Sequence, residues 1–168
     1  MSPPKSASRP KKILDARSAK AVAYDLLARK AWSRRDLIVR LRRRGAPDDV
    51  ARLVVAELEE RGYVDDPAFA RQWAEGRARR LGSRRLHQEL RRRGIARPLA
   101  AAAVSLAFVE GEEAERALEA ARRRLPALMK RNSSRAPQRL RDFLLRRGYP
   151  AGVVNSVVRR LCPIDESE

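Results

Sequence analysis

The residues best suited to chemistry are arginines at the end of a repeated pentapeptide, and the chemistry that they suit is anion binding. The pentapeptide occupies residues 41–45, 90–94 and 144–148, and its first two copies are identical, Leu-Arg-Arg-Arg-Gly. A guanidinium group holds five N–H donors in a fixed fork and stays charged in proteins. Arginines that recur along a chain therefore favour a long, repeating anionic partner.

The middle residue of each basic run is expected to point away from the core. Leu37 and Leu41 lie four residues apart and share one helix face, and Arg43 lies about 200° from Leu41 at ~100° per residue. We predict that Arg43 and its counterparts Arg92 and Arg146 form a spaced basic row that contacts a partner. Further candidates for this surface are Arg42, Arg91, Arg79, Arg80, Arg84 and Arg85.

The helix dipole offers an explanation of the same arginines that needs no partner. Cations in the last turn of a helix are stabilised by the partial negative charge of its C-terminus. This explanation suits Arg44, Arg93 and Arg147, which lie near the apolar edge of their helices, better than it suits the outward row. The sequence leaves both explanations open.

Groups that could support catalysis are few and isolated. The chain has one histidine, His87, and one cysteine, Cys162. It has no phosphate-binding glycine loop, His-Glu-x-x-His motif or serine nucleophile elbow. The neighbouring acids Asp65 and Asp66 precede Pro67, an arrangement typical of a helix cap. We therefore expect no enzyme, no metal site and no cofactor.

The elements that position the arginines are helices ended by glycine. Each pentapeptide glycine can adopt the left-handed conformation that stops a helix, and a new apolar stripe follows it. The glycines recur at intervals of 49 and 54 residues, which leaves room for three helices in each repeat. We predict an all-α fold of three tandem three-helix repeats in an elongated array with room for curvature. The predicted bounds are a disordered basic tail over 1–17, repeats over 18–61, 62–110 and 111–162, and a frayed acidic C-terminus over 163–168.

Apolar periodicity predicts the buried faces of these helices. In the third helix the inward residues are predicted to be Val50, Leu53, Val54 and Leu58. In the sixth they are predicted to be Leu99, Ala102, Ala103 and Leu106. The first helix is expected over 18–31, and Pro126 is expected to kink or end the helix that begins near residue 112.

Composition and charge restrict the location and the partner. The net charge is +18, which points to nucleic acid or a nucleoprotein. No stretch is apolar enough to span a membrane, and the N-terminal residues lack the apolar run of a secretory signal. A lone cysteine suits a reducing compartment. We expect a cytoplasmic protein.

The order and spacing of several short pieces resemble the RecX regulators of the bacterial RecA recombinase. The resemblance covers residues 18–161. Its pieces are Tyr24, Leu27-Ala28-Arg29, Ser33, Leu37, Leu41, Arg44-Gly45, Gly62-Tyr63-Val64-Asp65-Asp66, Phe69-Ala70, Arg85-Leu86, Glu89-Leu90 and Gly94-Ile95. The resemblance implies three tandem three-helix repeats and binding to the RecA filament on single-stranded DNA, and we expect the chain to be a monomer. It also implies restraint of ATP hydrolysis and strand exchange, with direct DNA contact left open.

Two other classes of function remain open. The glycine-turned helix pairs could be helix-turn-helix units that read duplex DNA, as in a transcription factor. The chain could also bind single-stranded nucleic acid without sequence preference and independently of RecA. Against the second class, only 5% of residues are aromatic, which leaves few platforms on which bases could stack.

Overall fold

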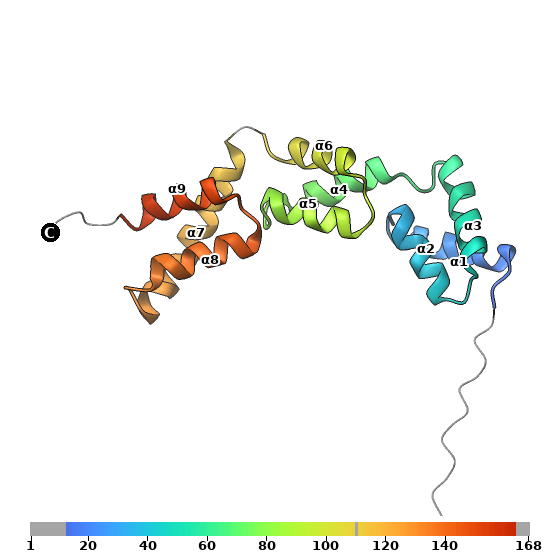
Figure 1. Ribbon diagram of the computed structural model, residues 1–168, viewed down its shortest axis with the longest axis horizontal. Helices are drawn as coiled ribbons and strands as arrows, with labels where there is room; N and C mark the ends of the chain where they lie inside the picture. The colour runs from blue at the N-terminus through green and yellow to red at the C-terminus, as the bar shows by residue number, and fades with distance from the viewer. Residues whose placement is uncertain (1–12, 110, 164–168) are drawn as a thin grey trace, which may run out of the picture. The chain divides into compact units, whose positions relative to one another are not determined.

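The computed structural model describes residues 13–109 and 111–163, and within these residues the fold is all-α (Figure 1). This confirms the predicted fold class. The helices are α1 (Ala16–Arg29), α2 (Arg34–Arg43), α3 (Asp48–Glu60), α4 (Asp66–Ala78), α5 (Ser83–Arg92), α6 (Arg97–Ala107), α7 (Glu112–Arg131), α8 (Ala136–Arg147) and α9 (Ala151–Leu161). None of these helices is long and apolar enough to cross a membrane.

Buried side chains gather in one cluster for every three successive helices. The clusters belong to α1–α3, α4–α6 and α7–α9. At the centre of each lie the two leucines that precede its basic run, all fully buried: Leu37, Leu41, Leu86, Leu90, Leu140 and Leu144. Burying one leucine contributes about 1.5–3 kcal/mol, so the leucine spacing that repeats in the sequence also stabilises each repeat.

The glycine after each basic run ends its helix in the left-handed conformation, as predicted. The φ angles of Gly45, Gly94 and Gly148 are 107°, 84° and 86°. In the second repeat the Gly94 amide donates to the Arg91 carbonyl at 3.0 Å, and the Ile95 amide donates to the Leu90 carbonyl at 3.1 Å. This bond pair is the Schellman motif. It turns the chain sharply and leaves the last-turn arginine side chains on the surface.

The chain divides into two compact units, Met1–Asp66 and Pro67–Glu168. In the first unit, the Ser33 hydroxyl caps α2 by accepting from the Asp36 amide at 3.2 Å, as predicted. Asp66 was expected to cap its own helix, but α4 begins at Asp66 and the Asp66 carboxylate accepts from the Arg34 amide at 2.8 Å. The acid therefore satisfies a donor at the start of α2, and burial raises its pKa.

In the second unit, the start of α5 is joined to the turn between α8 and α9 by backbone hydrogen bonds. The Gly82 amide donates to the Arg147 carbonyl at 2.9 Å, and the Arg84 amide donates to the Gly148 carbonyl at 3.1 Å. The Ser83 amide donates to Glu113 Oε1 at 2.6 Å. The first amides of α5, which have no partner within their own helix, are thus satisfied by the third repeat.

Several boundaries and faces differ from the predictions. The first helix begins two residues early, at Ala16, because the Asp15 carboxylate caps it through the Ser18 amide. Residues 1–12 of the predicted basic tail and residues 164–168 of the predicted acidic end lie outside the described residues. Pro126 does not end α7, which continues to Arg131.

The predicted inward faces of α3 and α6 are partly wrong. Leu53 and Leu106 are 65% and 67% exposed, and Ala102 is also exposed. The predicted Val54, Leu58 and Ala103 are buried, and residues that were not predicted complete each buried stripe at helical spacing. The buried residues are Ala51, Val54, Val55 and Leu58 in α3, and Ala100, Ala103, Val104 and Ala107 in α6.

A candidate polyanion-binding surface

The outward row lies where helix geometry predicts it. Arg43, Arg92 and Arg146 occupy the last turns of α2, α5 and α8, and all three side chains are exposed. Their neighbours Arg42 and Arg91 are exposed as well. The helix dipole also favours arginines in the last turn of a helix. The exposure of these arginines therefore does not by itself show that a partner binds them.

In the second unit, predicted arginines of α5 and α8 line two surface hollows that share residues. One hollow is lined by Arg84, Arg85, Gln88, Leu145, Arg146, Gly148 and Tyr149. The other is lined by Arg84, His87, Gln88, Arg91 and Arg92. Because Arg84 and Gln88 belong to both, the two hollows are neighbours. We call the exposed arginines of these hollows, Arg84, Arg91, Arg92 and Arg146, the α5–α8 basic surface.

The joint between the second and third repeats sets the geometry of this surface. Gly148 has no room for a side chain, because an added Cβ would lie 2.2 Å from the Arg85 Cβ and 2.5 Å from the backbone nitrogen of Arg85. A Cβ on Gly82 would lie 2.5 Å from backbone atoms of Gly148. Only glycines allow the two backbones to meet here. This close contact holds Arg84 of α5 beside Arg146 of α8.

The remaining predicted residues occupy separate places. Arg42 and Arg43 line a hollow of the first unit together with Asp48. The Arg42 guanidinium pairs with Asp48 at 3.1 Å, and a hydrogen bond from Arg52 lowers the pKa of Asp48. Arg79 and Arg80 are exposed in the turn after α4. Membership of Arg43 in one row with Arg92 and Arg146 stays a prediction.

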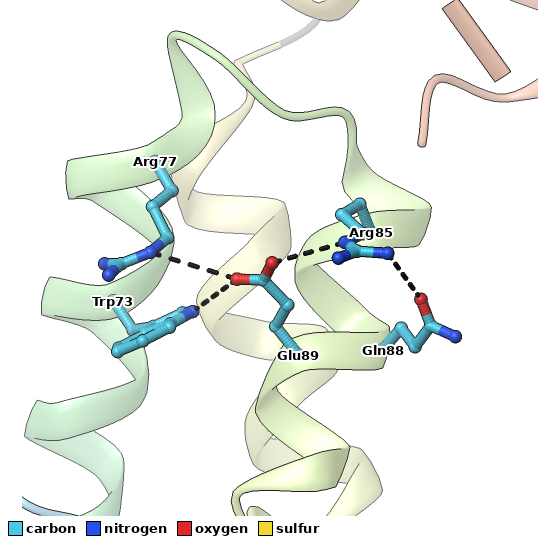
Figure 2. Close-up of polar contacts among 5 residues, drawn as sticks. All are labelled: Trp73, Arg77, Arg85, Gln88 and Glu89. Carbon is cyan, nitrogen blue, oxygen red and sulfur yellow. Dashed lines mark hydrogen bonds and ion pairs between the residues drawn. The ribbon is translucent and has the colours of Figure 1, made fainter. Parts of the chain in front are cut away.

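Arg85 is held inside the second repeat by a cluster centred on Glu89 (Figure 2). Glu89 Oε1 accepts from Arg85 Nε at 3.2 Å, and Glu89 Oε2 accepts from Trp73 Nε1 at 3.1 Å. Arg77 Nε lies 3.8 Å from Glu89 Oε2, and Arg85 Nη1 donates to Gln88 at 3.4 Å. Glu89 thus links α4 to α5 and holds the Arg85 side chain, which also lines the hollow.

The half-buried Trp73 ring is covered by guanidinium groups. Arg77 lies 3.4 Å and Arg93 3.7 Å from the ring centroid. Arg147 similarly lies 4.6 Å from the ring centroid of Phe143. Cation–π contacts of this kind stabilise by about 0.5–1 kcal/mol or more. They give Arg93 and Arg147, which the sequence assigned to the helix dipole, a packing role.

Three further arginines in the third repeat were missed by the sequence analysis. Arg124 and Arg131 of α7 and Arg139 of α8 line a hollow with Arg146. In each helix the two arginines are seven residues apart, which places them on one face. This spacing was visible in the sequence. The expected kink or end of the helix at Pro126 concealed it in α7, which in fact continues to Arg131.

Groups suited to metal or nucleophilic chemistry remain scattered within the described ranges. No three His, Cys, Asp or Glu side chains of these residues lie close enough to hold a metal ion. His87 lies half-buried on α5. Burial raises the pKa of the Cys162 thiol, which lowers the thiolate fraction on which cysteine reactivity depends.

Comparisons with known proteins agree on one family. Residues 65–104 match the model described as RecX, second three-helix domain, and residues 111–158 match RecX, third three-helix domain. The regulatory protein RecX of Amycolatopsis mediterranei (strain U-32) is 35% identical over 85% of this chain and 82% of its own length. The regulatory protein RecX of Thermobifida fusca (strain YX) is 39% identical over 84% of this chain and 77% of its own length.

Solved structures give the same fold. The crystal structure of RecX from Lactobacillus salivarius superposes with a TM-score of 0.72 at 15% identity, covering 89% of this chain and 97% of that one. A crystal structure of regulatory protein RecX superposes with a TM-score of 0.74 at 20% identity, covering 84% and 73%.

Proposed function

Because the chain belongs to the RecX family of regulatory proteins, we propose that it binds the RecA filament on single-stranded DNA. Binding restrains ATP hydrolysis and strand exchange by RecA. The chain acts as a monomer in the cytoplasm and needs no cofactor. Its role in the cell is then the control of homologous recombination and of the DNA repair and SOS response that depend on RecA.

The observation that carries this proposal is the α5–α8 basic surface. Its four arginines are exposed, and the hollows that they line share Arg84. A filament of protein and DNA presents anionic groups at regular intervals, and a basic surface raises both the rate and the strength of association with it. The close backbone contact at Gly82 and Gly148 fixes the spacing of the arginines before binding, which lowers the entropic cost of association.

The first unit carries a matching arginine, Arg43. Its helix ends with the same leucines, basic run and left-handed glycine as α5, and its side chain is equally exposed. Repeat proteins present equivalent residues of successive repeats to extended partners. We propose that Arg43, with Arg42 beside it, contacts the filament at a second position.

The helices that follow the glycine turns offer few side chains for sequence-specific reading of duplex DNA, which is the alternative function. The exposed side chains in the middle of α6 are Ala101, Ala102, Ser105 and Leu106. Base edges in the major groove are read mainly by arginine, lysine, asparagine and glutamine side chains. A helix with this surface has little with which to distinguish one base pair from another.

Stacking on single-stranded bases also has little support. Trp73 and Phe143 are contacted by guanidinium groups, Trp32 has the Lys30 ammonium 4.1 Å from its ring centroid, and Tyr63 packs edge-on against Tyr24. Open aromatic faces are the usual platform for nonspecific single-strand binding. Contact with DNA within the filament is therefore proposed to be through phosphates.

Charge reversal of the outward row tests the proposal. The variant Arg43→Glu, Arg92→Glu, Arg146→Glu should fold, because exposed substitutions usually change stability by less than about 0.5 kcal/mol. It should lose cosedimentation with RecA–DNA filaments. A control with three other exposed arginines reversed, Arg71→Glu, Arg135→Glu and Arg160→Glu, changes net charge equally and should retain binding.

The two outcomes that contradict the proposal are distinct. If the row variant folds and cosediments as well as the parent protein, the binding surface lies elsewhere. If the control loses binding equally, the interaction depends on net charge alone and not on this surface. Reversal of Arg93 and Arg147 should instead reduce stability, since both guanidinium groups pack on aromatic rings.

A further inference from the structure

The hollow between α7 and α8 gathers four arginines around one space. Its volume is about 460 Å³, and its basic lining consists of Arg124, Arg131, Arg139 and Arg146. One carboxylate, Asp142, shares the lining and accepts from the Gln138 amide at 3.1 Å. The remaining lining residues are Ala127, Leu128 and Phe143. The charge of this hollow is therefore strongly positive.

The guanidinium groups in this hollow lack anionic partners among the described residues. No ion pair there joins Asp142 or any other acid to the four arginines. Arg139 Nη1 is buried and has no hydrogen-bond acceptor. Buried donors are nearly always hydrogen-bonded, and an unsatisfied one is destabilising. Four like charges around one space also repel one another unless an anion lies between them.

We propose that the α7–α8 hollow binds a phosphate group. Arginine forks match phosphate oxygens in bidentate geometry, and their hydrogen bonds to an anion are among the strongest in proteins. Arg131 of α7 and Arg139 of α8 both line the hollow, so a phosphate bound there would receive donors from two helices. Arg146 also lines the neighbouring hollow of the α5–α8 basic surface, so a phosphodiester chain can continue from one hollow to the next.

This inference goes beyond the proposed function, because it assigns direct phosphate binding to a site that does not require RecA. Two sources can supply the group, the backbone of a nucleic acid or a free nucleotide. The continuity through Arg146 favours the backbone. A nucleotide would bind the α7–α8 hollow alone.

Binding assays with the full chain and no RecA test the inference. Fluorescence anisotropy would follow a labelled oligothymidylate, and calorimetry would follow ATP and inorganic phosphate. The variants are Arg131→Gln and Arg139→Gln, singly and together, and the matched control is the double variant Arg71→Gln, Arg160→Gln. Each lost arginine should weaken binding by about tenfold, as expected for a charge-assisted hydrogen bond.

The result separates the two sources. Weaker oligothymidylate binding with a shallower salt dependence assigns the site to a nucleic acid backbone. Loss of ATP or phosphate binding with unchanged oligothymidylate affinity assigns it to a nucleotide. The proposal is overturned if the double variant and the control bind all three probes equally. Arg131 is exposed, so Arg131→Gln gives a decisive answer even if Arg139→Gln unfolds.

Because RecA is absent from these titrations, their outcome is independent of the regulatory function. A chain that binds phosphate but leaves RecA unaffected would contradict only the proposed function. If the double variant Arg131→Gln, Arg139→Gln still acts on RecA, the α7–α8 hollow is not required for that action. Such a result would not contradict phosphate binding in the hollow.

Discussion

Alanine at Gly148 should disrupt the joint between the second and third repeats. Two effects act at this position. Its φ of 86° is unfavourable for any residue with a Cβ, by about 1–2 kcal/mol. The added Cβ would also lie 2.2 Å from the Arg85 Cβ and 2.5 Å from the Arg85 nitrogen. Overpacking of this kind costs about 1–3 kcal/mol. Gly148→Ala should therefore lower the free energy of unfolding by about 2–5 kcal/mol, the sum of the two effects.

Two other glycines of the same unit separate the effects. Gly111 has a φ of 85° and nothing within 4 Å of an added Cβ, so Gly111→Ala should cost only the conformational part, about 1–2 kcal/mol. Gly82 has an ordinary φ of −80°, but its Cβ would lie 2.5 Å from Gly148 backbone atoms. Gly82→Ala should therefore cost only the steric part, about 1–3 kcal/mol.

Urea unfolding followed by circular dichroism would measure the three losses. The double variant Gly82→Ala, Gly148→Ala should lose less than the sum of the single variants, because both substitutions break one contact. The contrary result would be that Gly148→Ala costs no more stability than Gly111→Ala while Gly82→Ala is neutral. In that case the two backbones do not meet in solution.

Three further predictions concern single side chains. Gly76→Ala, in the last turn of α4 with nothing within 4 Å of an added Cβ, should raise the free energy of unfolding by up to about 0.5–1 kcal/mol, measured in the same urea assay. Glu89→Ala leaves Trp73 Nε1 without its acceptor and should cost about 1–3 kcal/mol, whereas Glu89→Gln, which keeps an acceptor, should cost less. Asp66 has a pKa that burial raises above its usual value, so its ionised form is disfavoured in the folded state and its contribution to stability grows as pH falls through the folded pKa. Asp66→Asn retains an acceptor for the Arg34 amide, and it should match or exceed the stability of the parent protein at neutral pH and lose that advantage at acidic pH. Greater instability of Asp66→Asn at neutral pH than at acidic pH would contradict this assignment.

The features that could be predicted from the sequence are those fixed locally along the chain. The leucine pair and the glycine of each repeat act within one helix and its turn, so Leu41, Leu90 and Gly94 have the predicted burial and conformation. The outward position of Arg92 follows from the same helix geometry. These assignments need no knowledge of neighbouring repeats.

The features that could not be predicted depend on contacts between distant residues. Apolar periodicity places Leu53 inward, yet Leu53 is exposed and Ala51 lies in the buried stripe, where small side chains permit close packing. The partner of Asp66 lies 32 residues away in the chain. The contact of Gly82 with Gly148 is likewise invisible to periodicity, because no local pattern marks two backbones that meet.

In the candidate basic surface, too, some features follow from local sequence and others depend on contacts between distant residues. Helix geometry identified Arg92 and Arg146 separately, but only the fold places Arg84 between them. The continuation of α7 past Pro126 aligns Arg131 with Arg139. A proline predicts the end of a helix when its neighbours are unknown. Packing of the helix against α8 and α9 outweighs that preference here.

ATP hydrolysis by RecA on single-stranded DNA, measured with and without this protein, tests the central claim most directly. Increasing amounts of the chain should slow hydrolysis, and reversal of Arg43, Arg92 and Arg146 should abolish the effect while helicity is retained. Unchanged hydrolysis at every concentration of a correctly folded parent protein would contradict the proposal that it regulates the RecA filament.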